Sequence, residues 1–290
     1  MKLGQKVVAA VLLAVAAGGM TRADEKVYQR TLPSTVLVLG KTANGGASGS
    51  GVLVDQKRKL MLTNYHVVQD TKQLVVIFPS YDEDGELIVE RAAYVAKLKE
   101  LRRQGRLVAA KVVKQEPRTD LALVELEKVP EDARAIRLAA KSAKLGQCVH
   151  SIGNPGASDG LWLYSQGTVR HVYRRKFVLD GDSEVRARVV ETQSPVNSGD
   201  SGGPVVNDQG KLVALVQSAP GVLRGQPRQL LRQEVFLPLV VALPGLVRQM
   251  TVRFAPAAGP AAHRPRGDYR DYARRRWPSG LRRTGPPRII

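Results

Sequence analysis

Cysteine is nearly absent from this sequence of 290 residues, which contains only Cys148. A single thiol cannot form an internal disulfide, so the fold must be held by its buried core alone. Aromatic residues are also scarce at 5%, but hydrophobic residues reach 43%, which is enough to build such a core. We therefore interpret Cys148 as a small buried hydrophobic residue of a globular protein.

Ligand patterns for metals and cofactors are missing as well. The Cys, His, Asp and Glu residues show no metal-ligand spacing, and no glycine-rich loop has the pattern that binds phosphates. The sequence therefore predicts no cofactor and no metal.

Long apolar runs are limited to one, VVAAVLLAVAA, near the start of the chain. It falls short of the roughly 20 residues that a membrane-spanning helix needs, which argues against the alternative of an uncleaved membrane anchor. The basic MKLGQK before it and the small residues after it are typical of a secretory signal that is cut after Ala23. We expect residues 1–23 to be a signal peptide and the mature chain to have no transmembrane helix. The protein is then exported to the periplasm or the cell exterior.

Acidic residues are outnumbered, 26 against 45 Lys and Arg, and the net charge is +19. Residues 254–290 contain nine Arg, two Asp and no Lys, with Pro and Gly throughout and too few apolar residues to form a core. We expect a disordered Arg- and Pro-rich tail with a weak attraction to nucleic acid or to anionic envelope polymers. The alternative is that the tail binds nucleic acid more tightly, by charge and by base stacking, because its Arg residues are interleaved with Tyr and Trp.

Short β-type runs separated by Gly, Asn, Asp and Pro fill most of the chain up to about residue 250, and this spacing predicts an all-β barrel or sandwich. One stretch differs, because Tyr94, Leu98 and Leu101 recur at helical spacing with acidic residues before them and basic residues after them. It predicts a helical insertion at about residues 82–105 with a structural role, a lid or a subunit contact being the alternatives. The closing segment LPLVVALPGLVRQM is expected to form a short helix that is interrupted at Pro244.

The segment NSGDSGGP, residues 197–204, places Ser201 among glycines. An ordinary turn would have the same composition. A nucleophilic serine, however, needs such a tight loop, because the oxyanion that forms must meet donors already aimed at it. Gly199 can adopt backbone angles that let its N–H converge with that of Ser201. Ser201 is thus a candidate nucleophile, provided that a base lies elsewhere in the chain.

The search for that base is short, because the chain has four histidines. His66, in LTNYHVV, lies in a polar turn between apolar runs and is the candidate. His150, His171 and His263 lie in strand-like runs or in the tail, and we interpret them as packed or exposed side chains. Asp120 opens an apolar strand in PRTDLALVEL and is the candidate acid that would fix the tautomer of His66. Taken alone it has the place of an ordinary turn residue.

The segments GSGVLVD, LTNYHVV, TDLALVEL, SIGNP, SQGTV and NSGDSGGPVVN, in this order, resemble the landmarks of the chymotrypsin-like serine proteases. They are most similar to the disulfide-free bacterial HtrA/Deg branch, over roughly residues 30 to 250. The resemblance implies two six-stranded β-barrels with the site in the cleft between them. It implies that His66 is the general base, Asp120 its orienter and Ser201 the nucleophile. The oxyanion donors would be the backbone N–H groups of Gly199 and Ser201.

On this resemblance we expect a trypsin-like serine protease domain over residues 24–253, an endopeptidase that acts on unfolded or damaged proteins. The chain departs from the family pattern at three points. His66 and Asp120 are 54 positions apart, longer than in the HtrA branch, and the helical insertion accounts for the excess. Asp200 stands where that branch usually has Asn, so we expect it to meet a nearby basic group. We also expect no PDZ module after the protease domain.

The substrate pocket is inferred from the same resemblance, which places Pro195 near its base. A proline has no carboxylate to pair with Lys or Arg, so a preference for those side chains is not expected. One wall of the pocket is expected from Ala214, Leu215, Val216 and Gln217, which favours small or medium apolar side chains. Two other functions stay open: a catalytically silent relative that binds peptides in the cleft, and a polyanion-binding protein that acts through its tail.

Overall fold

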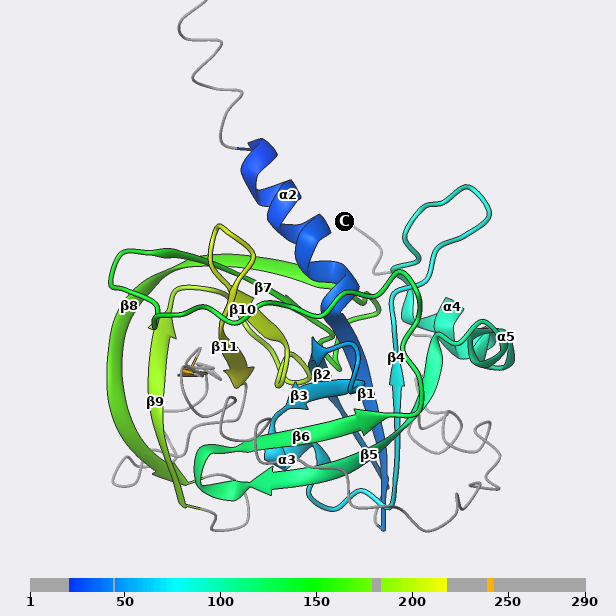
Figure 1. Ribbon diagram of the computed structural model, residues 1–290, viewed down its shortest axis with the longest axis horizontal. Helices are drawn as coiled ribbons and strands as arrows, with labels where there is room; N and C mark the ends of the chain where they lie inside the picture. Colours follow the sequence, from blue (N-terminus) through cyan, green and yellow to red (C-terminus); the bar gives the residue numbers. More distant parts are fainter. Residues whose placement is uncertain (1–20, 44, 179–183, 218–238, 243–290) are drawn as a thin grey trace, which may run out of the picture.

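The computed structural model describes residues 21–43, 45–178, 184–217 and 239–242. Within these residues the chain forms two closed six-stranded β-barrels (Figure 1). The predicted all-β double barrel is therefore confirmed. Most of the predicted signal peptide and the whole Arg-rich tail lie outside the described residues.

The first barrel closes in the order β1-β2-β3-β6-β5-β4, with every neighbouring pair antiparallel. Its strands are β1 (Thr35–Thr42), β2 (Gly45–Asp55), β3 (Leu60–Thr63), β4 (Gln73–Ile77), β5 (Leu107–Glu116) and β6 (Leu121–Leu126). Side chains alternate across each strand, so Val36 and Val38 fill the inside of this barrel while Leu37 packs outside it.

The second barrel closes in the order β10-β11-β12-β9-β8-β7. Its strands are β7 (Cys148–Gly153), β8 (Leu163–Val178), β9 (Glu184–Thr192), β10 (Pro204–Val206), β11 (Leu212–Gln217) and β12 (Leu239–Ala242). The expectation of a helix in the closing segment was wrong over β12, because this strand pairs with β11 on one side and with β9 on the other and thereby closes the barrel.

A layer of buried aliphatic side chains joins the two barrels. Leu62 and Leu123 of the first barrel belong to the same cluster as Val189, Val206 and Leu215 of the second. All five are almost completely buried. The two barrels therefore pack against each other through this apolar layer, while each has a separate cluster of its own inside.

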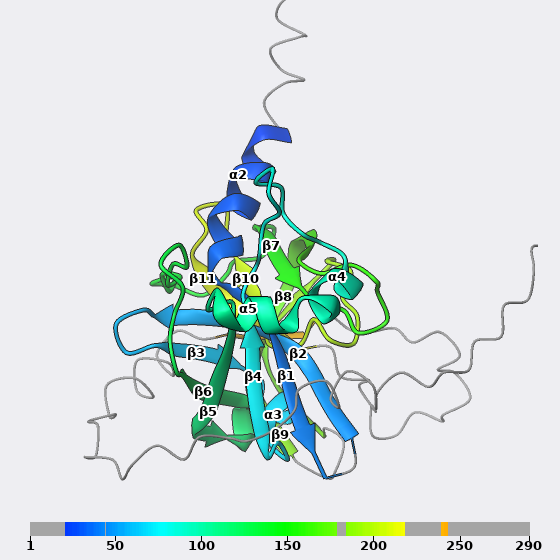
Figure 2. The same ribbon diagram turned by 90° about the vertical axis from the view of Figure 1, so that its right-hand side faces the viewer.

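The predicted helical insertion is present, but it is helical only in its second half. It contains α4 (Arg91–Ala96) and α5 (Leu98–Arg103), which lie across the outside of the barrels (Figure 2). The first half is a turn, because the Asp82 carboxylate accepts the N–H groups of Asp84 and Glu86 and so competes with helical hydrogen bonds.

The helices of the insertion are anchored by two buried side chains, Tyr94 and Leu101. The hydroxyl of Tyr94 accepts the N–H of Ser80 at 2.8 Å and the indole N–H of Trp162 at 3.0 Å. Because Trp162 precedes β8, the insertion contacts the second barrel as well as the first. This arrangement supports a structural role for the insertion.

The described chain begins with α2 (Thr21–Thr31), which runs into a single 3₁₀ turn, η1 (Leu32–Ser34). Val27 of this helix is buried in the layer between the barrels, and the Tyr28 hydroxyl donates to the carbonyl of Trp162 at 3.1 Å. The helix is thus packed on the body of the protein. Over the described residues, no helix has the length and apolar character needed to cross a bilayer.

Candidate active site

Asp120 and His66 form the centre of the site. One carboxylate oxygen of Asp120, Oδ2, lies 2.8 Å from His66 Nδ1, and the other, Oδ1, accepts the backbone N–H of His66 at 2.9 Å. The Asp120 side chain is 0% exposed, whereas that of His66 is 25% exposed. Because an ionised carboxylate can only accept hydrogen bonds, it holds the imidazole proton on Nδ1. Nε2 is therefore left as the proton acceptor.

The residues before His66 are hydrogen-bonded to the main chain of Asp120. His66 lies in a single helical turn, α3 (Tyr65–Val68), whose Val67 and Val68 are buried. The carbonyl of Asp120 accepts the side-chain amide of Asn64 at 3.0 Å and the backbone N–H of Tyr65 at 3.2 Å. The position of the ring is thus set by both the main chain and the side chain of Asp120.

Asp120 itself lies in a conformation that few residues adopt. It follows the 3₁₀ turn η2 (Pro117–Thr119) with φ 53° and ψ 46°, in the left-handed region, directly before β6. Aspartate tolerates this region better than most side chains. The turn lets a buried carboxylate face α3 from the start of a core strand.

A third donor to this carboxylate comes from the second barrel. Gln217, the last residue of β11, donates from Nε2 to Asp120 Oδ2 at 3.0 Å. Sequence reasoning missed this role, because Gln217 is 97 positions from Asp120 and no local pattern distinguishes it. With it, the carboxylate accepts three hydrogen bonds in a buried setting.

The loop that carries Ser201 is held against the first barrel. The Ser201 carbonyl accepts the N–H of Ser50, on β2, at 2.7 Å, and Ser201 is only 3% exposed. A Cβ at Gly49 would lie 2.7 Å from a methyl of Val67 and 3.1 Å from the Ser201 carbonyl. Because Gly49 has no side chain, the Ser201 loop and the helical turn of His66 both approach β2 closely.

The loop also needs glycine at two positions with positive φ. At Gly202, with φ +87°, a Cβ would lie 2.1 Å from the carbonyl of Ser50, and at Gly199, with φ +101°, it would lie 2.5 Å from the nitrogen of Gly156. Any side chain there would clash with fixed backbone. The glycines around Ser201 are thus required by close packing, which an ordinary surface turn would not require.

The N–H of Gly199 is oriented by its neighbours. The carbonyl of Ser198 accepts the N–H of Gly156 at 2.7 Å, and the carbonyl of Gly199 accepts the Ser50 hydroxyl at 3.0 Å. In a trans peptide the N–H points opposite to the carbonyl, so the Gly199 N–H is directed away from the Gly156 loop. Within the described part of the chain it has no acceptor. Such a donor suits a developing oxyanion.

The family described as "Trypsin-like peptidase domain" matches residues 49–215, more than half of the chain. The chain belongs to this family. The matched range includes His66, Asp120 and Ser201, and Gln217 lies just beyond it.

Curated relatives of this peptidase domain are bacterial serine proteases. It is 29% identical over 184 residues to "Periplasmic serine endoprotease DegP" of Salmonella typhimurium strain LT2, covering 61% of this chain and 32% of the relative. It is 28% identical over 174 residues to "Serine protease Do-like HtrA" of Bacillus subtilis, covering 58% of this chain and 32% of the relative. The chain thus spans about a third of the length of these relatives. The resemblance to the HtrA/Deg branch is confirmed.

Solved structures share the fold of the peptidase domain. The active form of the Rv3671c protease from M. tuberculosis superposes with a TM-score of 0.58 at 21% identity, covering 80% of this chain and 86% of that one. Deg5 superposes with a TM-score of 0.55 at 19% identity, covering 79% and 93%. At these identities the likeness is one of fold.

The predicted pocket residues of the peptidase domain do not all face one open space. Pro195 is exposed, while Ala214, Leu215 and Val216 are buried, Leu215 in the layer between the barrels and the other two in the second barrel. Gln217 is occupied by its hydrogen bond to Asp120. The residues that follow it lie outside the described residues, so the pocket stays a prediction.

Asp200, next to the candidate nucleophile, is buried without a charged partner. Its Oδ2 accepts the N–H of Asn197 at 2.7 Å, and no basic side chain of the described residues forms an ion pair with it. Burial raises the pKa of this carboxyl to about 6, only partly opposed by the hydrogen bond from Asn197. The expected basic partner is thus not found in the described part of the chain.

Proposed function

We propose that this protein is an exported serine endopeptidase in which Ser201, His66 and Asp120 act together through an acyl-enzyme. The observation that carries the proposal is the 2.8 Å contact between His66 Nδ1 and Asp120 Oδ2. It leaves Nε2 of His66 free of its proton, as a general base requires. The family to which the domain belongs supports the same assignment.

In this mechanism His66 Nε2 takes the proton of the Ser201 hydroxyl as Oγ attacks the peptide carbonyl. The buried Asp120 carboxylate stabilises the imidazolium that forms, and the Gly199 and Ser201 N–H groups bind the oxyanion. The imidazolium then gives its proton to the leaving amine, and an acyl-enzyme remains on Ser201. Water releases the acyl group by the same steps, with His66 again acting as the base.

A fluorophosphonate probe tests this proposal directly, because it reacts with an activated serine. The full chain should be labelled and should digest casein, an unfolded protein substrate. Ser201→Ala should abolish both, and His66→Ala should greatly weaken both. Ser198→Ala, on the same loop, is the matched control and should still be labelled. A labelled Ser201→Ala protein would contradict the assignment of the nucleophile, and an unlabelled native chain that still binds casein would favour a silent peptide-binding relative.

We further propose that the chain is exported and that its basic tail binds polyanions only as an accessory. The basic start, the short apolar run and Ala23 support the export. Val27 of α2, which packs on the barrels, lies after the predicted cleavage and would be kept in the mature chain. N-terminal sequencing of the mature protein tests the cleavage. Removal of residues 254–290 should leave casein digestion unchanged and abolish salt-sensitive binding to DNA. Loss of digestion with the tail would make the tail part of the catalytic machinery instead.

A further inference from the structure

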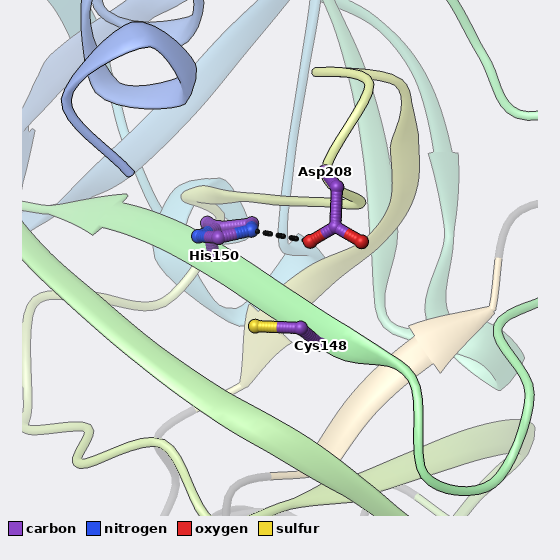
Figure 3. A group of neighbouring side chains, drawn as sticks. All are labelled: Cys148, His150 and Asp208. Atoms are coloured by element: carbon purple, nitrogen blue, oxygen red, sulfur yellow. Dashed lines mark hydrogen bonds and ion pairs between the residues drawn. The ribbon is translucent and has the colours of Figure 1, made fainter. Parts of the chain in front are cut away.

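Cys148, His150 and Asp208 form a cluster of potential metal ligands on the second barrel. Cys148 and His150 are two positions apart on β7, so both side chains lie on the same face of the strand, opposite to Val149 in the barrel core. Asp208 reaches them from the turn between β10 and β11 (Figure 3). One ligand atom from each of the three residues lies within 4.8 Å of the others.

The distances suit one metal ion. His150 Nε2 and Asp208 Oδ1 are 2.9 Å apart. Zinc bonds of about 2.1 Å to nitrogen and oxygen place two neighbouring donors about 3.0 to 3.4 Å apart, and a bond of about 2.3 Å to sulfur places the thiolate about 3.6 Å from each. The Asp208 side chain is 67% exposed and Cys148 is half-buried, so both can rotate to close the remaining gap.

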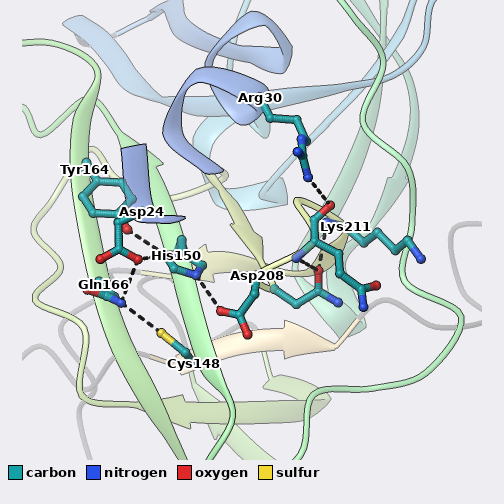
Figure 4. A network of polar contacts seen from close by, with 10 residues as sticks. Asp24, Arg30, Cys148, His150, Tyr164, Gln166, Asp208 and Lys211 are labelled. Atoms are coloured by element: carbon teal, nitrogen blue, oxygen red, sulfur yellow. Dashed lines mark hydrogen bonds and ion pairs between the residues drawn. The ribbon is translucent and has the colours of Figure 1, made fainter. Parts of the chain in front are cut away.

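The candidate ligands are hydrogen-bonded to neighbouring side chains, as metal ligands in proteins usually are. His150 is only 3% exposed, and its second nitrogen, Nδ1, lies 2.7 Å from the Tyr164 hydroxyl, which can accept a hydrogen bond from Nδ1–H when Nε2 binds a metal (Figure 4). Gln166 donates from Nε2 to Cys148 Sγ at 3.1 Å. This contact fixes the Gln166 amide beside the sulfur.

A further acidic residue, Asp24, lies beside the cluster. Asp24 on α2 accepts the Gln166 amide at 3.2 Å and lies 3.8 Å from His150 Nδ1. It adds negative charge beside the cluster without taking a place among the three ligands. Negative charge at this point opposes the strongly basic character of the chain and favours a cation.

We propose that Cys148, His150 and Asp208 bind one divalent transition-metal ion of the zinc class, with water as the fourth ligand. A thiolate and an imidazole select such ions over magnesium and calcium, which prefer oxygen ligands alone. On binding, the Cys148 thiol loses its proton to solvent as the sulfur–metal bond forms. His150 binds as the neutral imidazole with its proton on Nδ1, beside the Tyr164 hydroxyl, so that Nε2 is free to bind the ion next to Asp208 Oδ1. The metal links β7 to the turn after β10 and stabilises that part of the second barrel.

Cobalt is the probe of choice, because cobalt bound to a thiolate gives a charge-transfer absorption that cobalt bound to imidazole or carboxylate lacks. The reduced full chain carrying Ser201→Ala, which prevents self-digestion, is titrated with Co²⁺ and then with Zn²⁺. One equivalent of Co²⁺ should produce the band, Zn²⁺ should displace it, and bound Zn²⁺ should raise the melting temperature. Cys148→Ser should abolish the band.

Asp208→Asn is the most informative variant, because the residue lies on an exposed turn where the change leaves folding intact. It should weaken Co²⁺ binding at least tenfold, and His150→Gln should do the same. His171→Gln, an exposed histidine on β8, is the matched control and should bind as the parent does. Absence of the band in the parent, or unchanged affinity in Asp208→Asn, would overturn the proposal and leave His150 and Asp208 as an ordinary ion pair.

Discussion

Gln217, the last residue of β11 in the second barrel, donates a hydrogen bond to Asp120, directly before β6 in the first barrel. This contact crosses the interface at the point where the candidate acid is buried. It means that the carboxylate which orients His66 is itself positioned from both barrels. The arrangement can be tested at Gln217 as well as at the residues that the sequence motifs identify.

Replacing Gln217 with Leu should lower kcat/KM for peptide cleavage about tenfold, because a hydrogen bond to a buried charge contributes roughly 1.5–3 kcal/mol. The free energy of unfolding, measured with urea, should fall by an amount in the same range. Gln73→Leu is the matched control, since this glutamine is exposed on β4. Full activity in Gln217→Leu would show that two donors are enough to position the carboxylate.

Asp120→Asn should reduce kcat about ten-thousand-fold with the backbone unchanged and the Gln217 amide turned so that its oxygen faces the new NH₂. The backbone N–H of His66 can only donate, so the Asn oxygen must stay opposite it and the Asn NH₂ must face His66 Nδ1. The ring then carries its proton on Nε2 and cannot act as a base. Steady-state kinetics measure the loss, and Asp70→Asn on an exposed position is the control. A loss of less than tenfold would contradict the role of Asp120.

Gly199→Ala should lower kcat about a hundred- to a thousandfold while the enzyme still binds substrate, because the shifted backbone misdirects an oxyanion donor. The added methyl would lie 2.5 Å from the nitrogen of Gly156, so this peptide must move. Gly146→Ala is the control, since Gly146 also has positive φ but open space around it. It should cost stability without the loss of kcat. Equal kcat values for the two variants would count against the oxyanion role.

Asp200→Asn should stabilise the protein above pH 6 and have little effect near pH 4. In the folded protein the pKa of Asp200 is raised from 3.8 to about 6, so the folded state holds this proton more tightly than the unfolded state. The stabilisation from the protonated form is present below pH 3.8 and is lost as the pH rises through 6, at a cost of about 3 kcal/mol.

Urea unfolding of the parent and the Asp200→Asn variant from pH 4 to pH 8 measures this difference. The gap between the two unfolding free energies should open between pH 4 and 6 and then stay constant. A gap that does not depend on pH would mean that the carboxyl has a partner outside the described residues.

The sequence motifs predict the double barrel and the residues His66, Asp120 and Ser201, because each lies in a short segment whose local pattern marks it. The strand β12 was predicted as part of a helix. It has four residues, too few for alternation to appear, and it is stabilised by pairing with β11 and with the more distant β9.

Contacts between residues distant in sequence also explain which site residues were missed. Cys148 was interpreted as a buried hydrophobic residue, yet it is half-buried and accepts a hydrogen bond from Gln166. A spacing of two along a strand brings it next to His150, but Asp208 is 58 positions from His150 and reaches it only through the order of strands in the barrel. The role of Gln217 could not be predicted from the sequence for the same reason. Contacts of this kind follow from the closed topology and leave no trace in local spacing.

The hydroxyl of Ser50, on β2 of the first barrel, donates to the carbonyl of Gly199 and accepts the backbone N–H of Asn154, which follows β7 of the second. The reacting centre is therefore assembled only while both halves of the molecule are docked. For the proposed endopeptidase, separation of the two halves would therefore abolish peptide cleavage while most of the β-sheet hydrogen bonds are still intact.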